Sequence, residues 1–201
     1  STWVTATAFA RLRQRFVTGF VAFISALAIM VAPAHAAPLI RDAEIEATLR
    51  AYCIPIWRAA NLNPDDIHIY IINDPSINAF VAGGQNIFVH TGLIMAARNP
   101  NEIIGVLAHE TGHIAGGHLS RSREAMNQAL GPMLISIGLG VLAIAAGAPD
   151  AGAALIAGSQ GFAMANFVRF TQVQESSADQ AGATFLEQSG QSGRGLISFF
   201  D

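Results

Sequence analysis

The feature that most constrains this chain is an HExxH motif formed by His109, Glu110 and His113. It lies in an apolar run whose pattern is typical of a helix. Residues four apart share one face of a helix, so both imidazoles can bind one metal ion while Glu110 reaches a water on that ion. The motif therefore predicts the minimal apparatus of a zinc peptidase: two neutral nitrogen ligands, a general base and one open coordination position.

The residues before the motif carry the signals of a helix start. Asn99 occupies a capping position, Pro100 the first helical position, and Glu102 follows three residues after the cap. The next residues are strongly apolar, so we expect a buried helix that runs to about Arg123. A buried helix argues against the alternative of two solvent-facing histidines. Polar groups inside a protein need partners, and a metal ion provides one.

A second predicted helix carries a candidate third ligand. A capping-box pattern predicts that this helix starts at Thr171, and it should end near Gln188. Glu175 and Asp179 are four residues apart and hence lie on one face. Glu175 would complete a His-His-Glu zinc set, and Asp179 could accept a hydrogen bond from the outer nitrogen of a ligand histidine. The alternative for each is a solvated surface acid.

A rival third ligand can be rejected from spacing. Metzincins place a third histidine six residues after the second, but here that position is Leu119, and His118 is out by one residue. One residue on a helix is a rotation of about 100°. We therefore predict that His118 is not a ligand and that it faces solvent or a neighbouring helix.

Composition limits the class of protein. The chain has 201 residues, 52% hydrophobic and only 12% charged, where a soluble domain typically carries about 25% charged residues. The net charge of −3 argues against a nucleic-acid partner. A single cysteine, Cys53, excludes an internal disulfide and a cysteine-rich zinc cluster, and is expected to be a small buried residue.

The first 36 residues read as a secretory signal peptide. Three arginines precede an uncharged apolar run at residues 16–32, and Ala34-His35-Ala36 fits the cleavage pattern. The alternative is an uncleaved membrane anchor. Export predicts the periplasm of a Gram-negative bacterium, with membrane association left open. Because the chain starts without Met and ends where a new apolar segment begins, we expect residues 37–201 to be a C-terminally truncated catalytic domain.

A strand at residues 67–72 and a hairpin at residues 78–90 are predicted before the motif helix. The hairpin consists of two β-rich runs joined by Gly83-Gly84. Peptidases often bind an extended substrate as an added strand along a sheet edge, and this hairpin is the candidate edge. The alternative is a purely structural hairpin.

An apolar helical hairpin is predicted at about residues 131–165. Residues 131–148 are uncharged and marginally long enough to span a bilayer, but are rich in Gly and Ala. We favour a hairpin that packs over the domain or contacts a membrane surface, with spanning as the alternative.

Three segments together resemble a known family. HETGHIAGGH at 109–118, ESSAD at 175–179 and NAFVAGGQNIFVHTGL at 78–93 look like the gluzincin-type metallopeptidases that include HtpX and the CAAX prenyl protease. The signal peptide favours the exported, BepA-like periplasmic branch. The resemblance covers residues 40–190 and implies an α+β, mostly helical zincin-like domain, with a small β-sheet and the HExxH helix at its centre.

The same resemblance implies roles for individual residues. His109, His113 and Glu175 would bind one Zn²⁺ per chain, Glu110 would act as the base, and Asp179 would support a ligand histidine. The expected function is zinc-dependent endopeptidase activity on periplasmic or membrane-associated proteins, in envelope protein quality control. The alternatives are a chaperone for unfolded outer-membrane proteins with structural or latent zinc, and an integral-membrane HtpX-like protease.

Overall fold

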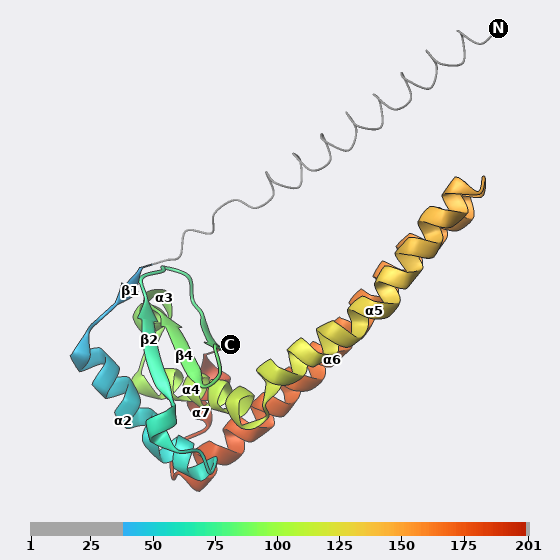
Figure 1. Cartoon of the computed structure of the whole chain (residues 1–201). Helices are drawn as coiled ribbons and strands as arrows, with labels where there is room; N and C mark the ends of the chain where they lie inside the picture. The colour runs from blue at the N-terminus through green and yellow to red at the C-terminus, as the bar shows by residue number, and fades with distance from the viewer. Residues whose placement is uncertain (1–37, 200–201) are drawn as a thin grey trace, which may run out of the picture. The chain divides into compact units, whose positions relative to one another are not determined.

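The computed structural model describes residues 38–199 (Figure 1). The predicted signal peptide, residues 1–36, lies outside the described residues. The described chain combines one small mixed sheet with several helices, which confirms the predicted α+β, mostly helical class.

The sheet has four strands in the order β1-β2-β4-β3. Its strands are β1 (Leu39–Ile40), β2 (His68–Ile72), β3 (Ala79–Ala82) and β4 (Asn86–His90). β2 and β4 are parallel, while β1 and β3 pair antiparallel with their neighbours. The predicted hairpin is confirmed as β3 and β4, joined by Gly83 and Gly84, which both have positive φ. β3 is the edge strand, and none of the described strands pairs with its outer side.

The sheet and its helices enclose a hydrophobic core. The helix α2 (Ala43–Ala59) contributes Leu49, Cys53 and Trp57, and the predicted burial of Cys53 is confirmed. The alternating inward residues of β2 and β4 complete this core, together with Leu93 of α3 (Thr91–Ala96) and Ile67, which follows the short helix η1 (Pro64–Asp66). Ala79 and Val81 of the edge strand β3 pack against this core.

The motif helix α4 (Pro100–Ala115) starts as predicted. The side chain of Asn99 accepts a hydrogen bond from the backbone N–H of Glu102 at 3.2 Å. The predicted end near Arg123 is wrong, because α4 stops eight residues earlier. Gly117 adopts the left-handed conformation at φ 62°, which a helix cannot continue, and a new helix starts at His118.

The predicted second helix is also longer than the sequence suggested. α6 (Pro149–Gln188) is one unbroken helix of 40 residues, so Thr171 is not its N-cap. The Thr171 hydroxyl instead donates to the carbonyl of Phe167, one turn back within the same helix. The predicted end at Gln188 is confirmed, and a short helix, α7 (Arg194–Ser198), follows and packs against α4.

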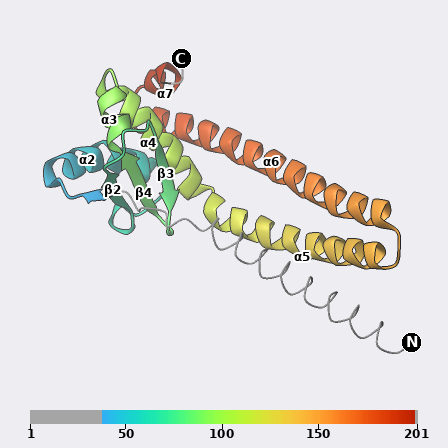
Figure 2. The ribbon, with the colours of Figure 1, turned by 90° about the horizontal axis from the view of Figure 1, so that it is seen from above.

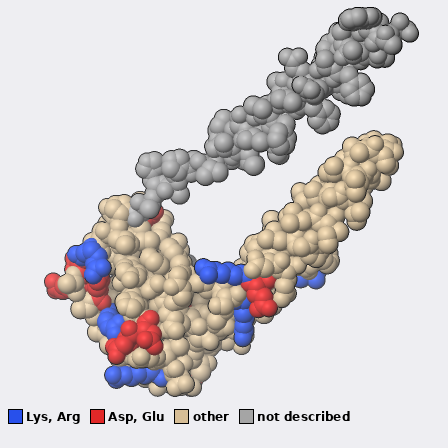
Figure 3. All heavy atoms as spheres, viewed as in Figure 1, with Lys and Arg blue, Asp and Glu red and all other residues tan. Residues whose placement is uncertain are grey.

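The apolar hairpin predicted at 131–165 is the outer part of a longer helix pair. α5 (His118–Ala145) and α6 run antiparallel, joined at residues 146–148, and extend away from the sheet and α4 (Figure 2). The expectation that it packs over the domain is wrong. Between residues 119 and 173 only Gly140 and Gly152 are buried, because the two helices contact each other and little else. The face in Figure 3 shows almost no charge along this outer part.

Candidate metal centre

α4 presents the three motif side chains together. His109 and His113 lie one turn apart on one face, and their Nε2 atoms are 3.1 Å from each other. Glu110 is buried beside them. This convergence is the direct consequence of helical spacing, as predicted from HExxH.

α6 brings an acid to the two imidazoles. Glu175 Oε2 lies 3.3 Å from His109 Nε2, and Glu175 Oε1 lies 3.5 Å from His113 Nε2. One ligand atom from each of the three side chains falls within 4.8 Å of the others, so the set could hold one metal ion. Two nitrogens and a carboxylate oxygen are a donor set that zinc accepts.

Small residues explain why α6 comes so close to α4. A Cβ on Gly112 would lie 2.5 Å from the backbone oxygen of Ala178, and a Cβ on Gly182 would lie 3.0 Å from the backbone of Ala108. Such contacts leave no space for a side chain between the two helices. The absence of side chains at Gly112 and Gly182 therefore sets the distance at which Glu175 meets the histidines.

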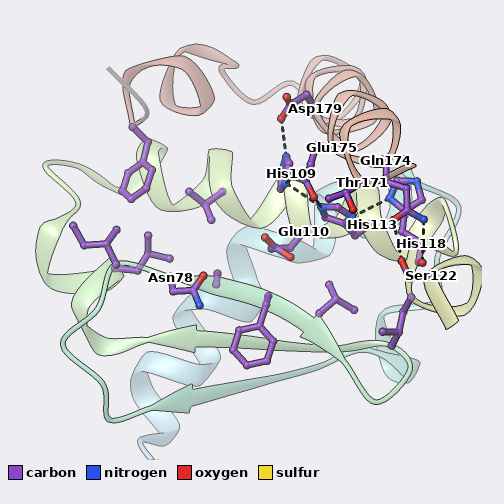
Figure 4. Close-up of a pocket in the computed structure, with 18 of the residues that line it drawn as sticks. Asn78, His109, Glu110, His113, His118, Ser122, Thr171, Gln174, Glu175 and Asp179 are labelled. Carbon is purple, nitrogen blue, oxygen red and sulfur yellow. Dashed lines mark hydrogen bonds and ion pairs between the residues drawn. The ribbon is translucent and has the colours of Figure 1, made fainter. Parts of the chain in front are cut away.

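Asp179 holds the outer nitrogen of one histidine. Its Oδ1 lies 2.7 Å from His109 Nδ1, one turn along α6 from Glu175 (Figure 4). The geometry fits an Nδ1–H that donates to the carboxylate and leaves Nε2 with a free lone pair. Glu175 and Asp179, which were predicted to share one helix face, thus contact the two ring nitrogens of the same imidazole, His109.

His118 contacts the outer nitrogen of His113. This contact was not predicted from the sequence. His118 Nδ1 lies 2.9 Å from His113 Nδ1, and the side chain is buried, so the expectation that it faces solvent is wrong and the neighbouring-helix alternative holds. The break at Gly117 turns His118 back toward α4. The signal for this was the Gly116-Gly117 pair, which makes helical phasing across it meaningless.

A buried glutamine fixes the start of α5 against α6. Gln174 donates from Nε2 to the backbone carbonyl of His118 at 3.1 Å and accepts from the Ser122 hydroxyl at 3.0 Å. Buried polar groups satisfied in this way restrict a site to one arrangement. Gln174 therefore positions His118. Because Gln174 is adjacent to Glu175 on α6, it also links the start of α5 to the helix that carries Glu175.

Electrostatics favour the neutral forms of His113 and His118. Burial lowers the pKa of His113, and the nearby His109 lowers it further. Burial is also the main cause of the lowered pKa of His118, followed by the charge of Arg121. A neutral imidazole keeps a lone pair, which both a metal ligand and a hydrogen-bond acceptor require.

The pKa of Glu110 is raised far above the ordinary value for a glutamate. Burial and then the charge of Glu175 raise its pKa to about 8. A proton acceptor works best when its pKa lies near the working pH. A cation bound beside Glu110 would lower this pKa and keep the carboxylate ionised.

The site opens into a cleft of about 750 Å³. Figure 4 shows Asn78, the residue before β3, on the opposite side of this cleft from the histidines of α4. Residues 77–81 line one wall, so the edge of the sheet runs past Glu110. An extended peptide could lie along this edge as an added strand.

The structure brings together all five residues predicted for the site: His109, Glu110, His113, Glu175 and Asp179. Two further residues, His118 and Gln174, belong to the same network and were not predicted. Two other histidines of the described chain, His68 and His90, lie outside this network. His90 is hydrogen-bonded to Ser76, and His68 is exposed on β2.

The chain resembles known proteins over most of its described length. A model of peptidase family M48 matches residues 39–200. The beta-barrel assembly-enhancing protease of Escherichia coli (strain K12) is 29% identical over 165 residues, 82% of this chain and 34% of that protein. The Yersinia pestis protein of the same name is 33% identical over 154 residues, 77% of this chain and 32% of its own length. Metalloprotease LoiP of Escherichia coli (strain K12) is 30% identical over 141 residues, 70% and 53% of the two chains. The chain thus spans about a third of the length of the first two relatives.

Proposed function

Because the chain belongs to peptidase family M48 and is a metalloendopeptidase, we propose that His109, His113 and Glu175 hold one Zn²⁺ and that Glu110 is the general base. Asp179 orients His109. The observation that carries this proposal is the meeting of ligand atoms from two helices within 4.8 Å, with Glu110 buried beside them.

The residues present fit zinc in particular. The donor set is two imidazole nitrogens and one carboxylate, and both outer imidazole nitrogens already have partners, Asp179 and His118. Such partners fix the ring orientation and tautomer that a ligand histidine needs. Hard cations such as Mg²⁺ prefer oxygen ligands, which this set does not supply in sufficient number.

Each protein group then has a defined task in peptide-bond hydrolysis. Zinc, when bound, supplies a Lewis acid and lowers the pKa of water toward neutrality. Glu110 takes a proton from the attacking water, whose oxygen bonds to the scissile carbonyl carbon. Glu110 then gives that proton to the amide nitrogen as the C–N bond breaks, so the products are a carboxylate and an amine. Burial of Glu110 keeps its proton exchange within the cleft.

The substrates we propose are proteins of the bacterial envelope. The exposed edge of β3 suits an extended polypeptide, which would bind through backbone hydrogen bonds. The names of two relatives refer to β-barrel assembly, and the sequence carries a predicted signal peptide. These observations support periplasmic cleavage of misassembled or unfolded outer-membrane proteins as the activity.

The decisive experiment compares two isosteric variants. Glu110→Gln should keep about one zinc ion per chain, because Glu110 is not a ligand, and should lower casein cleavage by roughly 10²–10⁴-fold. The matched control, Glu187→Gln, removes an exposed carboxylate from α6 far from the cleft and should keep both zinc and cleavage. Zinc content is measured by mass spectrometry and cleavage by peptide release. Full cleavage by Glu110→Gln would remove Glu110 from the mechanism.

A further inference from the structure

The outer part of the α5–α6 hairpin is almost free of charge. No Asp, Glu, Lys or Arg occurs in residues 125–149 or 151–168, so Asp150 at the turn is the only charged residue of this region. Both helices are long and apolar enough, by length and composition, to cross a membrane. Only 6% of each apolar stretch is buried within the described structure, so neither is the core helix of a soluble domain.

The apolar side chains of this region face outward in every direction that the partner helix leaves free. On α5, Leu134, Ile135 and Ile144 are all exposed. Relative to Leu134, helical geometry turns Ile135 about 100° one way and Ile144 about 80° the other way. A docked protein would cover one face of the hairpin, whereas lipid covers all of them. A helix that is hydrophobic all round belongs in a core or a membrane.

The contact between the two outer helices also suits lipid. Gly140 and Gly152 meet across the hairpin, and a Cβ on either would lie 2.7 Å or less from the backbone oxygen of the other. Close backbone approach at small residues is how helices associate where no hydrophobic force drives them together. In water such a contact would bury too little apolar surface to offset what remains exposed.

Length and charge place this region in a bilayer. The 21 residues 125–145 of α5 make a helix of about 31 Å, close to the roughly 30 Å of a hydrocarbon core. At the inner end of the uncharged segments lie Arg121, Arg123 and Arg169. Figure 3 shows basic and acidic side chains together at the base of the uncharged hairpin, and Glu124 follows Arg123 there. Arginines at that level complement the phosphates of lipid headgroups.

We propose that residues 125–145 and 151–168 form a membrane-embedded hairpin, inserted turn first, with Arg121, Arg123 and Arg169 at the headgroups. The metal site then lies at the membrane surface. Ser122 and Phe167, at the inner ends of the two segments, line the same cleft as Glu110. On the proposed function, the substrates are therefore polypeptide segments at, or emerging from, a bilayer.

The first test measures the depth of the hairpin in lipid. The full chain, purified as the cell processes it, is reconstituted with vesicles of phosphatidylethanolamine and phosphatidylglycerol. An environment-sensitive probe is attached at Ile135→Cys or, as control, at the exposed Met95→Cys on α3. Cys53 will not react, because it is fully buried and burial raises the pKa of its thiol.

Spin-labelled lipids then report the position of each probe. The probe at residue 135 should be quenched most by a label deep in the acyl chain, and the probe at residue 95 by neither deep nor shallow labels. Quenching at residue 135 only by a shallow label would show that the hairpin lies on the surface, which overturns the embedded arrangement. A probe shielded without lipid, together with a dimer in solution, would assign the surface to a second copy and overturn it too.

A matched pair of variants tests the energetics. Leu142→Asp puts a carboxylate into the embedded segment and should lower the vesicle-bound fraction, after an alkaline wash, by at least about tenfold. Met95→Asp, at a similarly exposed residue outside the hairpin, should leave it unchanged. An equal vesicle-bound fraction for Leu142→Asp and Met95→Asp after the alkaline wash would overturn the proposal.

The enzymatic function is tested separately. Leu142→Asp should still cleave a short soluble peptide in detergent, and Glu110→Gln should still show deep quenching at residue 135. In protein with Glu110 intact, absence of cleavage together with deep quenching at residue 135 would count against the proposed function alone. Cleavage without deep quenching would count against the membrane hairpin alone.

Discussion

The two ends of α6 use the same kind of helix contact for opposite purposes. At its C-terminal end, Gly182 and Ala178 pack against α4, and this contact brings Glu175 and Asp179 to the histidines. At its N-terminal end, Gly152 packs against Gly140 of α5, and the side chains next to this contact, Ile144 and Ile156, are apolar. Both contacts depend on small residues. The difference lies in what surrounds them.

The inner contact is enclosed by protein and the outer one is not. Around the inner end, Glu110, His118 and Gln174 are buried, and Gln174 donates a hydrogen bond to the backbone carbonyl of His118. Around the outer end, large apolar side chains such as Leu134 and Phe162 are exposed. One continuous helix therefore has buried polar neighbours at its inner end and exposed apolar side chains at its outer end.

The largest expected effect concerns the charge of Glu110 at the inner end. In protein stripped of metal, its pKa of about 8 lies above the unfolded value, so the folded state holds a proton that the unfolded state loses. Stability should therefore fall as pH rises from the unfolded pKa to about 8, by up to about 5 kcal/mol, and then level off. Urea unfolding of chelator-treated protein across this pH range measures the slope.

The control for this prediction is the neutral variant. Glu110→Gln should remove most of the slope and make the stripped protein more stable than wild type at alkaline pH. A wild-type stability that rises with pH over the same interval would contradict the burial argument.

The second prediction compares one glycine from each end of the helix pair. Gly112→Ala should destabilise the protein by about 3 kcal/mol, since its Cβ would meet the backbone of Ala178, which cannot move aside. Gly158→Ala, on the outer part of α6, meets nothing within 4 Å and should be neutral or stabilising by up to about 1 kcal/mol. Denaturant unfolding and zinc content measure both effects.

The zinc readout separates two explanations of the Gly112 effect. If the alanine variant is destabilised but binds zinc with unchanged affinity, the α4–α6 distance does not control the metal site. Loss of affinity in the remaining folded protein is the expected result.

The smallest effect compares two exposed aspartates on α6. Asp179→Asn removes the carboxylate that accepts from His109 and should weaken zinc binding by roughly 10–100-fold. Asp150→Asn makes the same chemical change at the outer turn and should leave zinc affinity unchanged. Competition with a chromogenic chelator gives both affinities. Equal affinity of the two variants would show that Asp179 is not a functional partner of His109.

Much of the local structure followed from short-range patterns. The Asn99 cap, the β3–β4 hairpin at Gly83-Gly84 and the shared face of His109 and His113 each depend on residues within one or two turns. Patterns of this range fail where two local signals compete. Thr171 resembles an N-cap but lies inside a continuous helix, because its hydroxyl bonds to the preceding turn.

The sequence by itself determined which side chains share a helix face, and so it predicted the five residues that the structure brings together and the uncharged hairpin. Only the tertiary structure decided how far apart these faces lie. His118 reaches His113 because the chain turns at Gly117, and Glu175 reaches His109, 66 positions away, because two glycines let α4 and α6 touch. The physical reason is that spacing along a helix is set by backbone geometry alone, whereas the distance between helices is set by the volume of the side chains that separate them.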